Sequence, residues 1–256
     1  MYETHSLTFA LDKWQGSAAI LPGVGVFIGH SGNNAEHKHW AHQVSITLET
    51  DLVISSGQRS IIGRALFVPA NTAHALQPST TLSMFVDPST LLAKVLTDAI
   101  SASSKICEIP YELAQSIFNC FDNTDALQAG VMRLQHSLCT ASNAASDSRK
   151  TIVLEKLHTI LQGNVVTRNE LAKLSCLSDS RFSHWFKEET GMPLRSYRKW
   201  LHLISGIEAI LNGESFHSAA YSANFSDQAH FTRTFKQAFG VSPSIALSNI
   251  RSQGKL

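Results

Sequence analysis

The stretch from residue 223 to residue 244 reads ANFSDQAHFTRTFKQAFGVSPS, and it is the second copy of a pattern in the C-terminal half of the chain. Two phenylalanines, a lysine and a glycine recur at a separation of 49 residues. The recurring residues are Phe182 with Phe231, Phe186 with Phe235, Lys187 with Lys236, and Gly191 with Gly240. Because side chains four positions apart lie on one face of a helix, each copy predicts a helix with a buried phenylalanine pair.

The residues around each copy predict where these helices begin and end. Ser-Asp pairs at 178–179 and 226–227 can accept hydrogen bonds from the free amides of a helix N-terminus. Each glycine suits the left-handed position after a helix, and a proline follows that can open the next helix. Shorter segments with helical spacing precede both copies, over residues 168–175 and 215–222. A short helix, a tight turn and a second helix predict two helix-turn-helix units.

These residues resemble the C-terminal DNA-binding domain of AraC-type transcriptional regulators, over roughly the last hundred residues. In that family one long helix joins the two units, and here it would run from Pro193 to Leu211. Asn224 stands where the family usually has a turn glycine, but asparagine can adopt the same left-handed conformation. The aromatic residue usual after the last proline is absent from residues 244–248. The resemblance implies a transcriptional regulator that binds double-stranded DNA, with RNA polymerase as a further partner.

Helical direction divides the second helix of each unit into a buried and an outward-facing set. The predicted inward side chains are Phe182, Trp185 and Phe186 in the first unit, and Phe231, Thr234 and Phe235 in the second. The outward side chains are the candidate DNA-binding residues: Ser180, Arg181, Ser183, His184, Lys187, Gln228, Ala229, Thr232, Arg233 and Lys236. Arg233 and Gln228 can make bidentate contacts with guanine and adenine edges, whereas the lysines suit phosphates. The alternative is that both faces are ordinary solvated helix surfaces.

The charge of the chain is unevenly distributed. Residues 1–149 hold 8 Lys and Arg against 12 Asp and Glu, which gives −4. Residues 150–256 hold 13 against 8, which gives +5. An acidic half joined to a basic half indicates that the C-terminal half meets a polyanion.

The N-terminal half contains short runs of β-favouring residues between turn residues. The runs are Val24–Ile28, Gln43–Leu48, Ser60–Val68 and Thr81–Val86. Apolar residues at helical spacing then predict helices over Leu91–Ala102, Tyr111–Phe121 and Ala126–Leu138. The predicted fold is multidomain, with α and β parts: a β-barrel over residues 1–88, a helical segment over 89–139, a linker over 140–148, and an all-α domain with two helix-turn-helix units over 149–256.

Histidines gather at two places in the predicted barrel. His37, His39 and Gln43 share strand parity and would point to one face, whereas His42 would point to the other. His74 follows a turn that contains proline, and a neighbouring strand could bring it beside the first group. The sequence therefore predicts a cluster of four side chains inside the barrel.

The spacing of this cluster resembles the metal motif of cupins, with Gln43 where glutamate is more common and Asn71 where glycine is usual. The resemblance implies a cupin-like sensor domain, which AraC-type regulators often carry at the N-terminus. It makes His37, His39, Gln43 and His74 the candidate ligands of a divalent transition metal. Zinc, copper, nickel, iron and manganese all accept imidazoles and a carboxamide oxygen, although a neutral oxygen attracts a cation less than a carboxylate does.

Other interpretations of the cluster stay open at this point. The same side chains could hydrogen-bond a small-molecule effector without metal, or could be ordinary interior or surface histidines. A metal-dependent cupin enzyme, such as an oxygenase or isomerase, would use the four residues with an open metal position. The segment lacks a well-placed acid–base pair beyond Glu36 and Glu49, and the attached DNA-binding domain makes sensing the simpler interpretation. We therefore predict that the chain is not an enzyme.

Two apolar stripes predict a homodimer through the helical segment, since two-fold homo-oligomers are the commonest assemblies. The stripes are Leu91, Leu92, Val95, Leu96 and Ala99, followed by Leu127, Val131, Leu134 and Leu138. The alternative is that both stripes dock on the barrel of their own chain.

Composition excludes several other classes of protein. The 256 residues are 43% hydrophobic and 16% charged, which is not the composition of a disordered chain. The longest apolar stretch, residues 18–28, is too short and too broken by proline and glycine to span a membrane. The first residues lack a basic region leading into an apolar one, so we expect a cytoplasmic protein. Four cysteines without a C-x-x-C pair predict reduced, mostly buried thiols.

Overall fold

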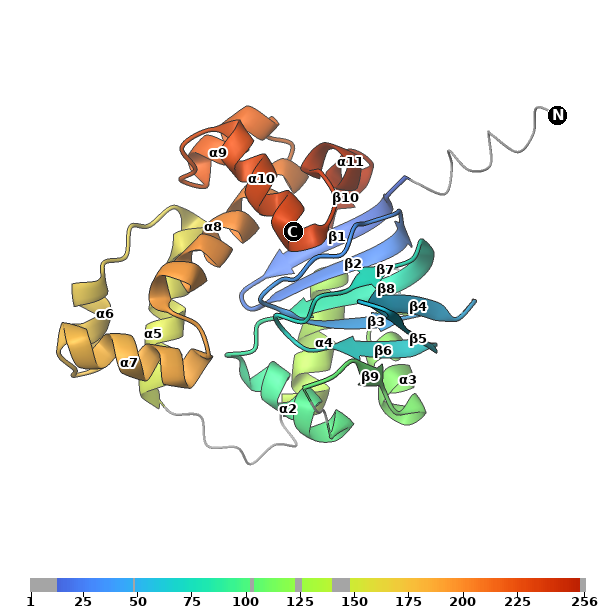
Figure 1. Ribbon diagram of the computed structural model, residues 1–256. Coiled ribbons are helices and arrows are strands. Elements are labelled where there is room, and N and C mark those ends of the chain that lie inside the picture. Colours follow the sequence, from blue (N-terminus) through green and yellow to red (C-terminus); the bar gives the residue numbers. More distant parts are fainter. Residues whose placement is uncertain (1–12, 48, 102–103, 123–125, 140–147, 254–256) are drawn as a thin grey trace. The chain divides into compact units, whose positions relative to one another are not determined.

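The computed structural model describes residues 13–47, 49–101, 104–122, 126–139 and 148–253, and Figure 1 shows its helices and strands. The chain forms two compact units. Unit 1 contains residues 1–142 and 232–256, and unit 2 contains residues 143–231. The predicted linker over residues 140–148 lies outside the described residues except for Ser148, where a helix begins.

Unit 1 is built on two β-sheets. The larger has the strand order β10-β1-β2-β8-β3-β6-β9, and the smaller has the order β5-β4-β7. The strands are β1 Gln15–Leu21, β2 Val24–Ser31, β3 His42–Ile46, β4 Leu52–Ser56, β5 Arg59–Gly63, β6 Ala65–Val68, β7 Ala75–Leu76, β8 Ser79–Val86, β9 Cys107–Glu108 and β10 Ile250–Ser252. The described strands pair antiparallel, apart from the parallel pair of β1 with β10. The two sheets agree with the β-rich N-terminal part that the sequence predicts.

The two faces of the larger sheet bury different side chains. One face carries Val26, Val44 and Met84, which pack in a core with helices. The helices are α2 Leu91–Ile100, α3 Tyr111–Asn119 and α4 Leu127–Cys139, coloured green in Figure 1. Because side chains alternate along a strand, Gln43 and Ser45 point to the opposite face. The histidine cluster is on that side of the sheet.

The apolar stripes that predict a homodimer are largely buried within unit 1. Leu92 and Leu96 of α2 and Val131 and Leu134 of α4 lie in the same core as the β-sheet residues. The stripes therefore dock on the barrel of their own chain, which was the alternative interpretation. Among the described residues of α3 and α4, the large apolar side chains left exposed are Tyr111 and Met132.

Unit 2 is helical and contains the first helix-turn-helix unit. Its elements are α5 Ser148–His158, a 3-10 helix over Thr159–Gln162, α6 Arg168–Leu174, α7 Asp179–Thr190, α8 Leu194–Leu211 and α9 Phe216–Ser222. Phe182, Phe186 and Tyr197 are fully buried in its core, where the rings of Phe186 and Tyr197 meet edge to face at 5.5 Å between centroids. The long helix expected from Pro193 to Leu211 is α8, with Pro193 as its N-cap.

The second helix-turn-helix unit consists of α9 and α10 Gln228–Phe239, and α11 Pro243–Leu247 follows it. Asn224 has a φ of 60°, so it takes the left-handed conformation expected of it in the turn. Gly191 and Gly240 have φ values of 74° and 70°, as the sequence predicts for the residue after each second helix. The first residues of α10 belong to unit 2, whereas Thr232 and the residues after it belong to unit 1.

Some elements differ from the sequence prediction. Strands β1 and β4 are not predicted: the small and polar residues of β1 have little β-propensity, and the apolar run of β4 is only three residues long. The single run over Ser60–Val68 is two strands, which belong to different sheets. The chain after residue 148 reads as helical throughout, yet Ile250–Ser252 forms β10 because the edge of β1 offers unpaired backbone groups.

Two further findings concern the cysteines and the membrane. Cys107 and Cys120 are half-buried and Cys176 is exposed, so the described thiols are free but less buried than predicted. In the part of the chain that the structure describes, every helix is too short or too polar to cross a bilayer.

Candidate histidine cluster and candidate DNA-binding helices

Backbone hydrogen bonds bring the predicted histidines together. His37 and His74 form an isolated antiparallel bridge in which each N–H donates to the other's carbonyl oxygen at 2.9 Å. The carbonyl oxygen of His39 accepts from the N–H of Asn71 at 2.8 Å. Asn71 replaces the usual glycine and takes its left-handed conformation, with a φ of 60°. The turn before His74 is thereby fastened to the segment that carries the other two histidines.

Each histidine ring is oriented by a backbone carbonyl group. The Nδ1 atoms of His37, His39 and His74 lie 2.8–2.9 Å from the carbonyl oxygens of Ala35, Ala41 and Thr72. A carbonyl oxygen only accepts, so Nδ1 carries the proton in all three rings. In a neutral ring of this tautomer, Nε2 holds the free lone pair, which is the arrangement typical of metal-binding histidines.

The free ring nitrogens converge with Gln43. The Nε2 atoms of His39 and His74 each lie 3.1 Å from Oε1 of Gln43. The three histidines offer ligand atoms within 4.8 Å of one another. Gln43 donates from Nε2 to Ser45 Oγ at 2.9 Å, with its carboxamide oxygen toward the rings. With the amide in this orientation, acceptor atoms face one another with no proton between them, a donor set that fits a cation.

Burial keeps the rings neutral. Burial, together with the charges of His74 and His37, lowers the pKa of His39 to about 3. Burial and the neighbouring His74 lower the pKa of His37 to about 4. The pKa of His74 is also lowered, chiefly by burial. The rings therefore present lone pairs rather than protons at neutral pH.

His42 lies apart from the cluster, as its strand parity predicts. Its Nδ1 accepts from the N–H of Ala70 at 3.1 Å, and its ring lies 5.2 Å from that of Phe67 between centroids. Phe67 belongs to the core under the helices, on the other face of the sheet. Parity explains only His42 and Gln43, since His37 and His39 lie before β3 begins and are placed by the bridge and the turn.

The acid–base residues near the cluster are limited. Glu36 accepts at Oε2 from the backbone N–H of Gly57 at 2.9 Å, and its charge raises the pKa of His74, against the larger lowering by burial. Inside the barrel a row of hydroxyls continues from Gln43 through Ser45 to Ser83, whose Oγ atoms lie 3.1 Å apart. These groups can bind and orient a ligand.

Two aromatic residues near the cluster were not predicted. The rings of Phe85 and Phe239 lie 5.2 Å and 6.0 Å from that of His39 between centroids. The strand parity of Phe85 with Ser83 could have identified the first. No pattern in the sequence relates Phe239 to residues so far away in the chain.

The candidate DNA-binding residues lie on the outer faces of α7 and α10. Ser180, Arg181, His184, Lys187, Gln228, Ala229, Arg233 and Lys236 are exposed, and Ser183 and Thr232 are half-buried. The six residues predicted to face inward are buried, except Trp185, which is half-buried against the core. The helical periodicity therefore divides both helices as predicted.

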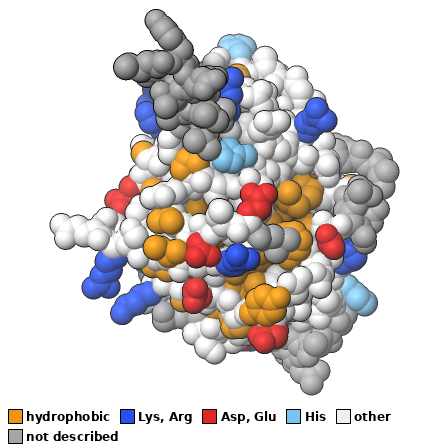
Figure 2. Space-filling model, turned by 90° about the vertical axis from the view of Figure 1, so that its right-hand side faces the viewer, with side chains coloured by type: hydrophobic (Ala, Val, Ile, Leu, Met, Phe, Trp, Pro, Cys, Tyr) orange, Lys and Arg blue, Asp and Glu red, His pale blue; other side chains and the backbone are white. Residues whose placement is uncertain are grey.

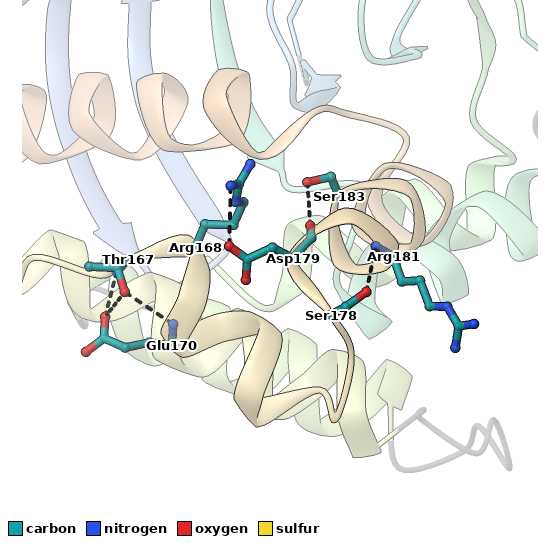
Figure 3. Close-up of polar contacts among 7 residues, drawn as sticks. All are labelled: Thr167, Arg168, Glu170, Ser178, Asp179, Arg181 and Ser183. Atoms are coloured by element: carbon teal, nitrogen blue, oxygen red, sulfur yellow. Dashed lines mark hydrogen bonds and ion pairs between the residues drawn. The ribbon is translucent and has the colours of Figure 1, made fainter.

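Caps fix the start of the helices in the first unit, as Figure 3 shows. Thr167 and Glu170 form a capping box at the start of α6. Ser178 caps α7 by accepting from the N–H of Arg181, and Asp179 pairs with Arg168 at 3.3 Å. The guanidinium of Arg181 extends away from these contacts (Figure 3).

In the second unit the corresponding cap is Asp227 rather than serine. Its carboxylate accepts from the N–H of His230 at 2.6 Å, one turn into α10. Ser178 and Asp227 are separated by the same 49 residues as the phenylalanines. The two caps are therefore equivalent members of the repeat.

Comparison with known proteins supports this reading of the C-terminal part. Residues 171–248 match a family of helix-turn-helix domains. The arabinose operon regulatory proteins of Salmonella typhimurium and Escherichia coli are each 37% identical to this chain over 76 residues, or 29% of the chain. The chain spans only 27% and 26% of the length of these curated relatives.

The fold of most of the chain resembles that of ToxT from Vibrio cholerae. One ToxT structure aligns with a TM-score of 0.53 and 11% identity, over 89% of this chain and 98% of ToxT. A structure of ToxT with bound unsaturated fatty acid aligns with a TM-score of 0.54, over 88% and 94%. At this identity the likeness concerns the fold.

A barrel followed by paired helix-turn-helix units defines the class of protein. The helix-turn-helix region of the chain resembles that of the arabinose regulators, and the fold of most of the chain resembles that of ToxT, which agrees with the resemblance to AraC-type regulators in the sequence.

Proposed function

We propose that this protein is a sequence-specific DNA-binding transcriptional regulator, and that a metal ion or small molecule bound at the histidine cluster controls its activity. The observation that carries the first part is the pair of equivalent helices α7 and α10. Both bury their phenylalanines and expose arginine and lysine on the outer face. Exposed glutamine, arginine and lysine on a helix suit the major groove and its phosphates.

Selection from a random duplex library with the full-length protein tests this part. We expect enrichment of a defined motif, and we expect protection from nuclease over two major-groove segments about one helical turn apart. Affinity should fall steeply as salt rises, because phosphate contacts release counterions. A library that shows no enriched motif would refute sequence-specific binding.

The effector part of the proposal rests on the donor set of the cluster. Three tautomer-fixed imidazoles and Gln43 Oε1 fit a divalent transition metal, and His37, His39, Gln43 and His74 would hold it. A bound cation would neutralise the converging lone pairs and order these side chains. A small organic effector is the second candidate, since the same ring nitrogens and the hydroxyls of Ser45 and Ser83 can hydrogen-bond one. ToxT binds an unsaturated fatty acid, which makes an organic ligand the natural competitor.

Metal analysis decides between these candidates. The protein is purified without chelator, and its metal content is measured beside mass spectrometry of co-purifying organic molecules. About one transition-metal ion per chain supports the metal, and a stoichiometric organic molecule without metal supports the second candidate.

The oligomeric state and RNA polymerase contact also belong to the proposal. Because the predicted apolar stripes are buried within unit 1, a homodimer would need other residues, of which exposed Tyr111 and Met132 are the largest on α3 and α4. Figure 2 shows a face on which hydrophobic side chains are interspersed with acidic and basic ones. Sedimentation of the wild type and of Met132→Lys tests this dimer, and transcription in vitro tests the polymerase contact.

A further inference from the structure

The residues that follow the DNA-binding face of α10 lie against the histidine cluster. We call Phe239 and Gly240 the closing segment. The N–H of Ala35 donates to the carbonyl oxygen of Gly240 at 3.0 Å. The carbonyl oxygen of the same Ala35 accepts from Nδ1 of His37 at 2.9 Å. Ala35 therefore connects the closing segment to the His37 ring, because its N–H contacts Gly240 and its carbonyl oxygen orients the ring.

The approach of Gly240 to this connection leaves no room for a side chain. A Cβ atom on Gly240 would lie 2.1 Å from the carbonyl oxygen of Ala35 and 2.9 Å from Nδ1 of His37. The φ of Gly240 is +70°, a conformation that disfavours other residues. The sequence pattern explains only the positive φ, because Gly240 follows the end of a helix. The lack of room for a Cβ atom arises from the contact of Gly240 with Ala35 and His37.

Phe239 covers the cluster beside this contact. Its ring lies 6.0 Å from that of His39 and 5.8 Å, edge to face, from that of Phe85. His39 and His74 are almost inaccessible, with 3% and 1% of their surface exposed. The closing segment is therefore part of the wall of the cluster.

The chain beyond the closing segment is fastened to the same sheet. Strand β10 pairs with β1, and the N–H of Gln253 donates to the carbonyl oxygen of Ala18 at 2.9 Å. The side chain of Gln253 accepts from the N–H of Leu127 at 3.3 Å. These contacts fasten the chain that follows the closing segment to unit 1.

We propose that the closing segment transmits the state of the histidine cluster to α10. A ligand that reorients His37 must alter the hydrogen bond to Ala35, and with it the contact that seats Gly240. Arg233 and Lys236 lie on the same helix, less than two turns before Gly240. The cluster and the DNA-facing side chains of α10 are therefore coupled reciprocally. This inference rests on the proposed function and names the residues through which it is regulated.

Hydrogen exchange of the full-length protein without added metal tests whether the closing segment is seated as described. Gly240→Ala should raise the exchange rate of the Ala35 amide about tenfold, because it displaces the carbonyl oxygen to which this amide donates, and should raise that of the Gln253 amide because the chain after Gly240 shifts with it. Gly213→Ala is the matched control, since its φ is +94° but a Cβ there meets no atom within 4 Å. It should leave both amides unchanged. Equal exchange in the wild type and Gly240→Ala, or an equal rise in Gly213→Ala, would overturn the proposal.

Phe239→Ala is a second variant that separates the loss of these contacts from a general loss of folding, because this substitution introduces no backbone strain. It should raise exchange at Ala35 while the amides inside β3 stay protected. Loss of protection throughout β3 in both variants would mean that the segment only stabilises the barrel, and would also overturn the proposal.

Perturbing the cluster and observing the segment tests the coupling itself. His37→Ala should change exchange over residues 232–253 by about tenfold, whereas His42→Ala should not, because His42 contacts the other face of the sheet. An unchanged segment in His37→Ala rejects the coupling.

Cobalt(II), followed by its visible absorption, is added in a parallel series to test the proposed metal separately. If cobalt fails to bind but His37→Ala still shifts the segment, the coupling stands and the metal does not. If cobalt binds the wild type without altering exchange over residues 232–253, the metal stands and the coupling fails.

Discussion

His37 and His74 exchange two backbone hydrogen bonds of 2.9 Å, and their rings lie 4.5 Å apart between centroids. This bridge joins the segment before β3 to the turn before β7, so the cluster is assembled from backbone pairing as well as from side chains. The Nδ1–H groups are already satisfied by carbonyl oxygens, and Nε2 is left for a ligand. The following predictions use this geometry and that of the two DNA-binding helices.

The cluster should bind metal through His39 and not through His42. His39→Ala removes an Nε2 that faces Gln43 Oε1, so bound metal should fall from about one ion per chain to a small fraction. His42→Ala is the control in the same region, and it should keep its metal. Elemental analysis of both variants checks this prediction, and equal metal in the two would contradict it.

The metal-free protein should lose stability as the pH falls from about 6.5 toward 4. In the folded state the pKa of His37 is about 4 and that of His39 about 3, below the ordinary value of 6.5. Between these values the unfolded chain binds protons that the folded chain does not, so acidification favours unfolding. Urea denaturation at several pH values measures the effect.

His39→Ala should flatten this pH dependence, because one buried neutral ring is removed. An identical pH profile in the wild type and the variant would rule out this source of acid sensitivity. Metal affinity should likewise persist below pH 6.5 and decline only as the pH approaches 4, which is lower than an exposed histidine cluster would allow.

Arg233 and Lys236 should contribute differently to DNA binding. Arg233→Ala should relax the preference at one base pair by about 1–3 kcal/mol if the guanidinium reads a base edge. Lys236→Ala should weaken binding to all sequences by similar amounts and reduce the dependence on salt. Competition binding with selected and random duplexes measures both. Equal losses on the two kinds of DNA for Arg233→Ala would remove its base-reading role.

Gly206→Ala should destabilise unit 2, although alanine normally favours a helix over glycine by about 1 kcal/mol. A Cβ on Gly206 would lie 2.6 Å from Cε2 of Phe231 and 3.2 Å from Cβ of Ala223. Forcing these groups apart should cost about 1–3 kcal/mol of unfolding free energy. Ser205→Ala, at the adjacent half-buried position of α8, should be neutral or stabilising. Denaturation that shows Gly206→Ala to be as stable as the wild type would contradict this packing.

The sequence by itself determined the elements whose signals are local. Phe182 with Phe186, and Phe231 with Phe235, specify two buried helix faces because four residues make about one turn. Asn224, Gly191 and Gly240 mark helix boundaries because few residues tolerate a positive φ. Strand alternation likewise placed Gln43 and His42 on opposite faces of the sheet, since successive side chains in β3 point in opposite directions.

Tertiary structure alone decided how distant segments meet. The bridge between His37 and His74, the contact of Gly240 with Ala35 and the pairing of β10 with β1 join residues that share no local pattern. The apolar stripes of α2 and α4 fitted either a second chain or their own barrel, and only the packed core shows that they fit the barrel. The physical reason is that periodicity specifies which face of an element is apolar, whereas the surface that covers this face depends on the shape and unpaired backbone groups of the rest of the fold.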